Sequence, residues 1–592
     1  RLEAYRPVEF ARNWNIAPAS SESFQEHLTM VQLSLQKKLA TKWGYGISLF
    51  NQEGNYNGVR HQIDGLFNKN GYKFLVNATL LNSESTINTS RFFRPTFSLS
   101  KQFKKLNNWR VGFDAFQEDN RIYAIDSANL SQSSFSFYET LYYIQTPTTS
   151  KNRLKISYGQ RYDFAPQNDE FVNTTIADNI KMEGALAKNP RNQLLWNITY
   201  RTLRVDTTIE KNINPEKTLL GQWTYNFVIK NGLIRSSTDY QIGSGQQQRV
   251  EYLYTPVAAQ LGDFIWVDHN QNGLQDNNEF EMATDNNLED SIRFVRIVVP
   301  SNEFQRTNQV KVNQSFSLNP KAIWFKTTGW QKWAGKLSAQ STFQINRQYV
   351  GVNNFAQYNP FYRADSSLVT SNNSIRNILY FNKGNSTFNM DYFFNKFSTQ
   401  TLLINGTDGS FKEEYGTKLR WGLGSNWNIQ GEYLQGFLQN KSEAFEDRDY
   451  LIDSWQFKPK LTFQQGVKFR CSLEYLEKHS EENTLSTASK LAIQRNLTTS
   501  LRWSTVRQST LNAKFSFITI QYEDDDGVDY STNTPAAFQI LQGLQPGQNF
   551  RWTINYETRL INNILLGITY DGKKSEELPV SHVGKVNLRA VF

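Results

Sequence analysis

Long stretches in which apolar and polar residues alternate constrain the fold of this chain most. In one such stretch, Trp552, Ile554 and Tyr556 share one face, while Thr553 and Asn555 lie on the other. A period of two residues is that of a β-strand with one apolar and one wet face. Soluble strands average about five or six residues, whereas this alternation runs for roughly ten, enough to cross a bilayer at a tilt. The stretch therefore predicts a membrane-spanning strand.

The same pattern recurs from one end of the chain to the other. Predicted strands flank turns at residues 40–41, 464–466 and 562–563, and the last predicted strand, 585–592, ends on Phe592. We therefore predict an all-β protein, a large transmembrane antiparallel β-barrel of roughly 22–28 strands with long extracellular loops. Residues 28–592 form the predicted barrel, after a lead-in or first strand at 1–27 and around an inserted loop segment at 256–290.

The composition agrees with this prediction. A mean hydropathy of -0.59 is no objection, because a barrel exposes only alternate residues to lipid, and no apolar run reaches the roughly 18 residues that a spanning helix needs. Aromatic residues make up 14% of the chain. Many tryptophans lie near predicted strand ends, where an amphipathic ring suits the headgroup layer. The sequence thus excludes a helical membrane protein and predicts aromatic girdles.

A large soluble all-β protein is the competing interpretation, since alternation alone cannot distinguish a lipid-facing surface from a core-facing one. A propeller would show a sequence repeat of about 40 to 50 residues, and none recurs. A single soluble domain of 592 residues would also be oversized, whereas a barrel grows by adding hairpins. Both points favour the membrane barrel.

Basic residues exceed acidic ones by nine, and part of this excess is predicted to face the barrel interior. A basic lumen would favour anions, but pairing with inward acids such as Glu474 and Glu557 would neutralise it, and we favour the pairing. No basic run with interleaved aromatics is present, so no nucleic-acid partner is predicted. The predicted inward cations are Lys418, Arg420, Lys458, Lys460, Lys468, Arg470, Arg502, Lys514, Lys585 and Arg589.

The sharpest local motif is the twelve-residue stretch 268–279. It offers oxygen ligands at positions 1, 3, 5 and 9, glycine at 6, a backbone carbonyl at 7 and a potentially bidentate glutamate at 12, as calcium loops do. A merely polar, asparagine-rich loop is the alternative. The predicted Ca²⁺ ligands are Asp268, Asn270, Asn272, Leu274, Asp276 and Glu279.

The residues before this motif, 262–267, have a strand pattern rather than that of an EF-hand helix. The stretch 262–281 resembles the GDxxWxDxNxNGxQDxxE segments of Gram-positive surface B-type repeats and of many Bacteroidota outer-membrane proteins. The C-terminal stretches 544–552, 570–575 and 586–592 resemble the close of large Bacteroidota outer-membrane barrel proteins. The resemblance implies structural calcium in a surface loop, integral location in the bacterial outer membrane, and a terminal aromatic residue that barrel-assembly machinery reads.

An enzyme is not predicted. The five histidines are scattered without metal-ligand spacing, and no nucleophile motif of the glycine-elbow type is present. The single cysteine, Cys471, is predicted to face lipid, and alone it forms no disulfide framework. These observations leave binding and transport as the classes of function to consider.

Three such functions remain. We favour a structural scaffold, or an assembly- or export-associated subunit, of a larger outer-membrane complex, with membrane lipids and other outer-membrane or lipoprotein subunits as partners. The alternative is an outer-membrane transporter or porin-like channel, although a TonB-dependent transporter should carry a plug domain before its barrel, whereas strand pattern begins here at about residue 28. A surface adhesin or receptor is the third. Because the sequence opens at Arg1 with neither a methionine nor a signal peptide, we expect it to be a mature or trimmed form of a longer product.

Overall fold

A computed structural model describes most of the chain, in two compact units. Unit 1 comprises residues 1–225 and 241–243, and unit 2 comprises residues 226–240 and 244–592. The described residues are 7–16, 26–37, 40–125, 129–167, 169–206, 215–257, 262, 264–268, 271–282, 292–324, 328–350, 355–362, 367–403, 406–443, 448–483, 490–505, 509–524, 534–542, 544–560, 564–576 and 579–590.

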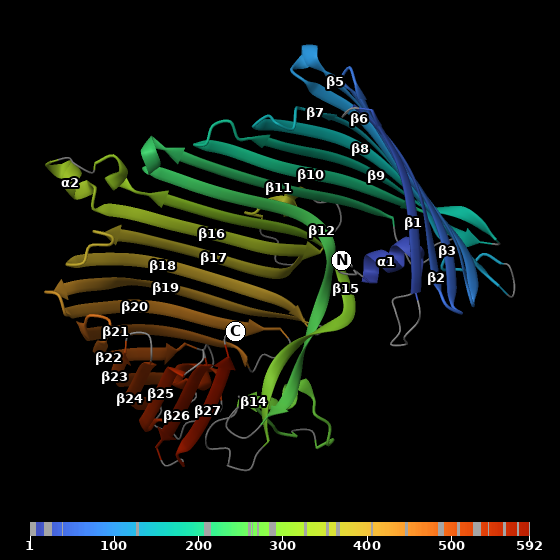
Figure 1. Cartoon of the computed structure of the whole chain (residues 1–592). Helices are drawn as coiled ribbons and strands as arrows, with labels where there is room; N and C mark the ends of the chain where they lie inside the picture. Colours follow the sequence, from blue (N-terminus) through green and yellow to red (C-terminus); the bar gives the residue numbers. More distant parts are fainter. Residues whose placement is uncertain are drawn as a thin grey trace. The chain divides into compact units, whose positions relative to one another are not determined.

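Unit 1 is an antiparallel sheet in which strands β1 to β10 pair in chain order (Figure 1). Strands β11 (Glu216–Ile229) and β12 (Ile234–Val257) each have residues in both units. The other elements of unit 1 are α1 (Pro7–Trp14), β1 (Glu26–Lys37), β2 (Thr41–Gln52), β3 (Tyr56–Lys69), β4 (Tyr72–Ser85), β5 (Asn88–Phe103), η2 (Lys104–Leu106), β6 (Trp109–Ala124), β7 (Phe135–Gln145), β8 (Asn152–Gln167), β9 (Glu170–Leu186) and β10 (Asn192–Val205).

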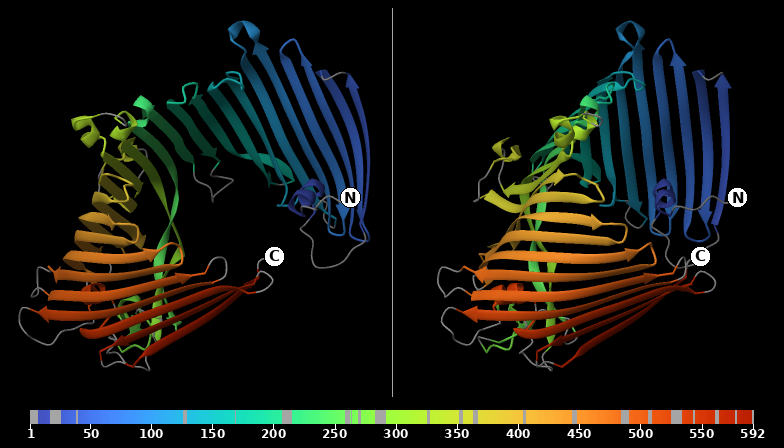
Figure 2. Two further views of the ribbon diagram at one scale, coloured as in Figure 1. Left: turned by 60° about the vertical axis from the view of Figure 1, so that its left-hand side comes forward. Right: turned by 90° about the vertical axis from the view of Figure 1, so that its left-hand side faces the viewer.

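Unit 2 repeats this organisation, and Figure 2 shows its consecutive hairpins side by side from β16 to β27. Its elements are η3 (Lys230–Gly232), β13 (Phe264–Trp266), η4 (Asn277–Glu279), β14 (Phe280–Met282), β15 (Arg293–Leu318), η5 (Pro320–Ala322), α2 (Trp330–Ala334), β16 (Leu337–Val350), η6 (Phe355–Tyr358), β17 (Leu368–Phe381), β18 (Phe388–Leu403), β19 (Gly406–Leu423), β20 (Trp427–Ser442), β21 (Tyr450–Gln465), β22 (Phe469–Glu482), β23 (Lys490–Ser504), β24 (Ser509–Asp524), α3 (Pro535–Leu541), β25 (Gly547–Leu560), β26 (Ile564–Ser575) and β27 (Ser581–Ala590).

The prediction of an all-β, antiparallel chain is confirmed. The described residues form 27 strands, within the predicted range, and all but β13 and β14 are longer than the five or six residues typical of soluble strands. None of the helices in the part of the chain that the structure describes is both long and apolar enough to cross a membrane.

The sheet of unit 2 has two chemically distinct faces. On β21, Trp455, Phe457 and Leu461 lie exposed on one face, which we call the apolar face. Lys458 and Lys460, between them in sequence, lie on the other, which we call the polar face. The cross-strand register carries this division to the neighbouring strands. By the same register Cys471, paired with Phe463, belongs to the apolar face as predicted.

The two ends of the unit 2 strands also differ. From β19 to β27, the connections at one end are three or four residues long: 424–426, 466–468, 505–508 and 561–563. We call this the short-turn end; Trp421, Trp427 and Trp503 lie close to it and are exposed, as expected for a girdle. The opposite, long-loop end carries the longer connections 443–449, 483–489, 525–546 and 576–580.

Each unit has a small core built by a helix. In unit 1, α1 begins at Pro7, a residue whose fixed φ suits a first helical turn. Its Phe10 and Trp14, four residues apart and so on one side of the helix, pack on Phe50 with ring centroids 5.0 and 5.2 Å away. In unit 2, α3 is capped by the Thr534 side chain and buries its apolar residues against β21, β23 and β24.

The boundary predicted for the last strand needs correction. Strand β26 continues to Ser575, with Lys573 and Lys574 paired to β25, so that only residues 576–580 connect it to the last strand. The last strand begins at Ser581 rather than Lys585, and Val591 and Phe592 lie outside the described residues. Polar residues on both sides of a strand's end obscured the alternation there.

Candidate functional site

The predicted calcium loop connects two short paired strands of unit 2. Strand β13 precedes it and β14 follows it, with Phe264 opposite Met282 and Trp266 opposite Phe280. Between them the backbone turns at Gln271 (φ 57°) and Gly273 (φ 72°). Because an L side chain is disfavoured at positive φ, Gly273 at the sixth position permits the turn that such a loop requires.

Three polar side chains of the loop converge. The Asp268 carboxylate accepts hydrogen bonds from the backbone N–H groups of Asn272 (3.2 Å) and Gly273 (2.9 Å). Asn272 donates from Nδ2 to Asp276 Oδ2 (3.1 Å), and its Oδ1 accepts from the N–H of Leu274 (2.6 Å). Hydrogen bonds within the loop therefore link the first, fifth and ninth positions, and the Asn272 side chain would have to turn over to present Oδ1 beside Asp276 to a cation.

Glu279, at the twelfth position, is the most telling member of the set. Its side chain is almost fully buried, with 1% of its surface exposed. One carboxylate oxygen, Oε2, accepts from Trp266 Nε1 (3.0 Å) and from the N–H of Asp276 (3.4 Å). The other, Oε1, is buried and has no hydrogen-bond partner among the described residues. A buried, unpartnered carboxylate oxygen is costly, and a hard cation would satisfy it.

The predicted ligands fit calcium better than a metal that is held by histidine, cysteine and carboxylate side chains alone. Among the described residues, no three His, Cys, Asp or Glu side chains are grouped closely enough to hold a metal by themselves. Calcium differs in accepting amide and backbone carbonyl oxygens beside carboxylates, which Asn272 and Leu274 supply here. Asn270, predicted at the third position, lies outside the described residues.

The loop is fixed to the rest of unit 2 by contacts that sequence reasoning missed. Phe280 stacks on Tyr254 with ring centroids 3.9 Å apart, within a buried aromatic cluster. Arg448 donates from Nη2 to the Asn277 carbonyl (3.1 Å) and to Tyr254 Oη (2.9 Å). Since Arg448 comes from the connection between β20 and β21, no sequence pattern could have linked it to the loop. The loop therefore lies at the long-loop end.

The polar face of unit 2 carries most of the predicted inward cations, several of them paired. Lys418 and Lys458 both contact Glu432 (3.3 Å each), and Lys460 contacts Glu474 (3.0 Å). The predicted pairing with cross-strand acids is confirmed for these three lysines, two of which share Glu432. Lys468 is an exception, because it lies in the turn between β21 and β22 rather than on a strand.

Three further cations on this face form a cluster in which no described acid pairs with them. Arg470 and Arg502 lie directly opposite each other on β22 and β23, and Lys514 lies on β24, opposite Ser500. None of the three forms an ion pair with a described residue. Together with Lys460 and neutral donors including Asn512, they line a cavity of about 390 Å³. Like charges placed opposite each other repel, so an anion bound there would be stabilised.

Comparison with known proteins gives no family. No family model and no curated protein matches the chain. Among solved structures, the FrpB iron transporter from Neisseria meningitidis is similar over 90% of this chain and 80% of its own, with 8% identity and a TM-score of 0.33. The copper transporter OprC aligns with 95% and 76% coverage, 7% identity and a TM-score of 0.30. The ferric preacinetobactin receptor BauA from Acinetobacter baumannii is similar over 94% of this chain and 76% of its own, with 10% identity and a TM-score of 0.28. At such scores these similarities carry no argument about function.

Proposed function

We propose that this chain is an integral β-barrel of the bacterial outer membrane whose polar face lines a passage for hydrophilic solutes, preferentially anions. The observation that carries the proposal is the contrast between the two faces of unit 2. One exposes large apolar side chains in alternate positions over many long strands, and the other presents ion pairs and uncompensated cations.

The apolar face argues for lipid contact. Soluble proteins rarely expose contiguous apolar patches larger than a few hundred Å², yet Leu419, Trp421, Ile429, Leu461 and Leu473 are exposed on five adjoining positions of four consecutive strands. Strands of this length match the thickness of a bilayer when tilted. Lipid is therefore the surrounding that suits this face.

The polar face argues for water on the other side. Charged side chains such as Arg470, Arg502 and Lys514 are stable only where they remain hydrated or bind counter-ions. A wide sheet with such a lining supports a transporter or porin-like channel more directly than a purely structural scaffold. The scaffold and adhesin hypotheses stay predictions, which purification from native membranes in mild detergent, followed by identification of stoichiometric partners, would address.

We also propose that the loop 268–279 holds a structural Ca²⁺. Asp268, Asn272, the Leu274 carbonyl, Asp276 and Glu279 would hold the ion, whose charge would stabilise the buried Glu279 carboxylate. Calcium would then stiffen the segment that Arg448 attaches to the long-loop end. Because connections on the extracellular side of such barrels are the longer ones, this end would face the calcium-containing exterior.

The passage is tested by reconstituting the purified protein into planar lipid bilayers and measuring conductance and reversal potential in a salt gradient. We expect ion conductance with an anion preference. The triple variant R470Q/R502Q/K514Q should lose that preference, whereas K418Q, which removes a cation already paired with Glu432, should keep most of it. A correctly inserted protein without conductance would contradict the proposed passage.

A further inference from the structure

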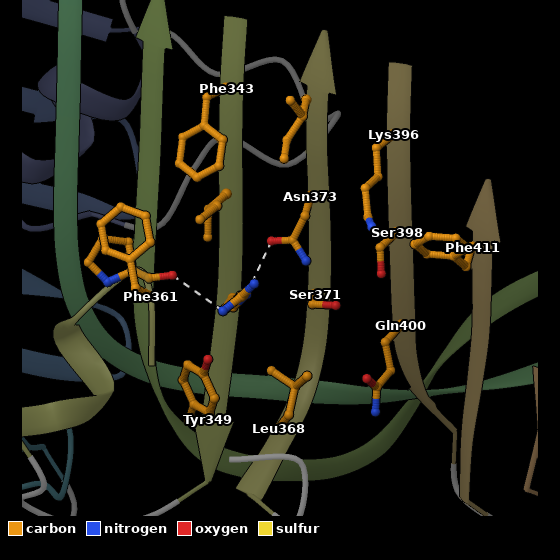
Figure 3. A pocket seen from close by; sticks show the side chains of 14 residues that line it. Phe343, Tyr349, Phe361, Leu368, Ser371, Asn373, Lys396, Ser398, Gln400 and Phe411 are labelled. Carbon is orange, nitrogen blue, oxygen red and sulfur yellow. Dashed lines mark hydrogen bonds between the residues drawn. The ribbon is translucent and has the colours of Figure 1, made fainter. Parts of the chain in front are cut away.

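A pocket of about 600 Å³ opens on the apolar face of unit 2, across β16 to β19. Figure 3 shows aromatic side chains at its edges, Phe343 and Phe361 on one side and Phe411 on the other. Between them lie polar side chains from β17 and β18, among them Asn373 and Ser398. The pocket has the size typical of ligand sites and combines apolar walls with a few polar groups.

A short segment of the connection between β16 and β17 forms one wall of this pocket. Its residue Gln357 accepts from Asn308 Nδ2 (2.8 Å) and donates to the Val350 carbonyl (3.1 Å). Tyr349 Oη donates to the Tyr362 carbonyl (2.8 Å). Tyr358 Oη donates to Asn308 Oδ1 (3.4 Å). The wall is thus held against the sheet by its own hydrogen bonds.

Arg347 gives the pocket a net positive charge. Its Nε donates to Asn373 Oδ1 (3.2 Å), and its Nη1 donates to the carbonyls of Pro360 (3.3 Å) and Tyr362 (2.9 Å). These acceptors are all neutral, and no described residue accepts from Nη2. The second cation, Lys396, is paired with Glu413 at 3.3 Å. Within the described part of the chain, one guanidinium charge therefore remains uncompensated, and its Nη2 can donate to an anion.

The position of the pocket shows what kind of anion suits it. On the same face, further toward the short-turn end, Leu379 and Tyr392 lie opposite each other and are exposed, as is Trp421. Toward the long-loop end the face becomes polar, with Ser371 opposite Gln400. The pocket thus lies where an apolar surface gives way to a polar one, as acyl chains give way to headgroups in a membrane.

We propose that this pocket binds the phosphate-bearing headgroup of an anionic membrane lipid. Arg347 contacts the phosphate, the amide and hydroxyl groups of Asn373 and Ser398 contact the headgroup, and the acyl chains lie along the apolar face beside Leu379 and Tyr392. The inference rests on the membrane placement proposed above, but it adds a site on the face opposite the passage.

The test is lipid binding to the delipidated full chain in neutral detergent, followed by native mass spectrometry. Phosphatidylglycerol and phosphatidylcholine with the same acyl chains serve as probes. We expect one site that prefers phosphatidylglycerol, and R347Q should weaken that binding about tenfold, the loss expected for a charge-assisted contact. The matched control is R376Q, which removes the same charge from the opposite face of the adjacent strand β17 and should leave binding unchanged.

A second variant tests the pocket independently, in case R347Q does not fold. S398W keeps every charge but fills the pocket, and should reduce binding of both lipids. Equal affinity for the two lipids, or equal losses in R347Q and R376Q, would overturn the proposal. Competition by glycerol 3-phosphate at the same concentration as the lipid would also overturn it, since the site would then be one for free phosphate. Conductance of R347Q should match that of the parent, so failure here is distinguishable from failure of the proposed passage.

Discussion

The Glu279 carboxylate makes the stability of the loop 268–279 depend on calcium in our proposal. One of its oxygens accepts hydrogen bonds from Trp266 and Asp276, while the other is buried and no residue that the structure describes donates to it. A bound Ca²⁺ would remove that penalty by giving this oxygen a cation to contact. At a calcium concentration 100-fold above Kd, binding would stabilise the folded chain by about 2.7 kcal/mol.

D268N and E279Q should therefore lose the calcium-dependent part of thermal stability. We expect the parent to melt several degrees higher in calcium than in chelator, and both variants to melt alike in the two conditions. In chelator, E279Q should melt at least as high as the parent, because its amide oxygen can still accept from Trp266 Nε1 while the uncompensated buried charge is removed. The control is E303Q, an exposed partner of Arg249 outside the loop. Equal melting of the parent in calcium and chelator would contradict the site.

Arg502 provides a second prediction for a single residue. Because it lies opposite Arg470 without an acid between them, R502Q should relieve repulsion and stabilise the chain by roughly 0.2–1 kcal/mol at low salt. Salt screens such repulsion, so the gain should shrink as ionic strength rises. Thermal melting at two salt concentrations measures the effect, with K460Q as the opposite case, since it breaks the contact with Glu474. A stability loss in R502Q would mean that Arg502 is compensated.

Among the elements of unit 2, helix α3 owes its placement to tertiary packing. Ile540 is buried in a cluster with Ile452, Ile518 and Ile520 from the polar face. Replacing it with alanine, I540A, should cost about 2–5 kcal/mol of local packing and speed amide hydrogen exchange within α3. Q539A, at an exposed neighbour, is the control and should leave exchange unchanged. Slow exchange retained in I540A would show that the helix does not depend on this contact.

Strands could be predicted from the sequence because alternation is a local signal. The predicted turn at residues 464–466 overlaps the end of β21 at Gln465 for the same reason, whereas the predicted turn at 562–563 lies outside the described residues. The helices were not predicted, because α1 and α3 are short and each is fixed by contacts with distant strands. For the candidate sites, the ligand pattern of 268–279 was visible in the chain, but Arg448 and the pocket around Arg347 depend on residues that only folding brings together.

At the scale of the whole molecule, a single principle links the proposals: one face of the sheet meets lipid and the other meets water. The calcium loop, the cation cluster and the lipid pocket lie in unit 2, the first at the long-loop end and the other two on opposite faces. If the faces were exchanged, the cations would lie in hydrocarbon, where a charge costs at least several kcal/mol. The assignment of the faces is therefore the central claim.

The most direct test is a spin-label scan along β23 in bilayers, in a C471S background. Labels at the odd positions from Leu491 to Trp503 belong to the apolar face, and labels at the even positions from Ala492 to Arg502 to the polar face. We expect accessibility to oxygen to peak at odd positions and accessibility to a water-soluble nickel complex to peak at even ones. Equal accessibility at both sets, or the reverse phase, would contradict a strand with lipid on one face and water on the other.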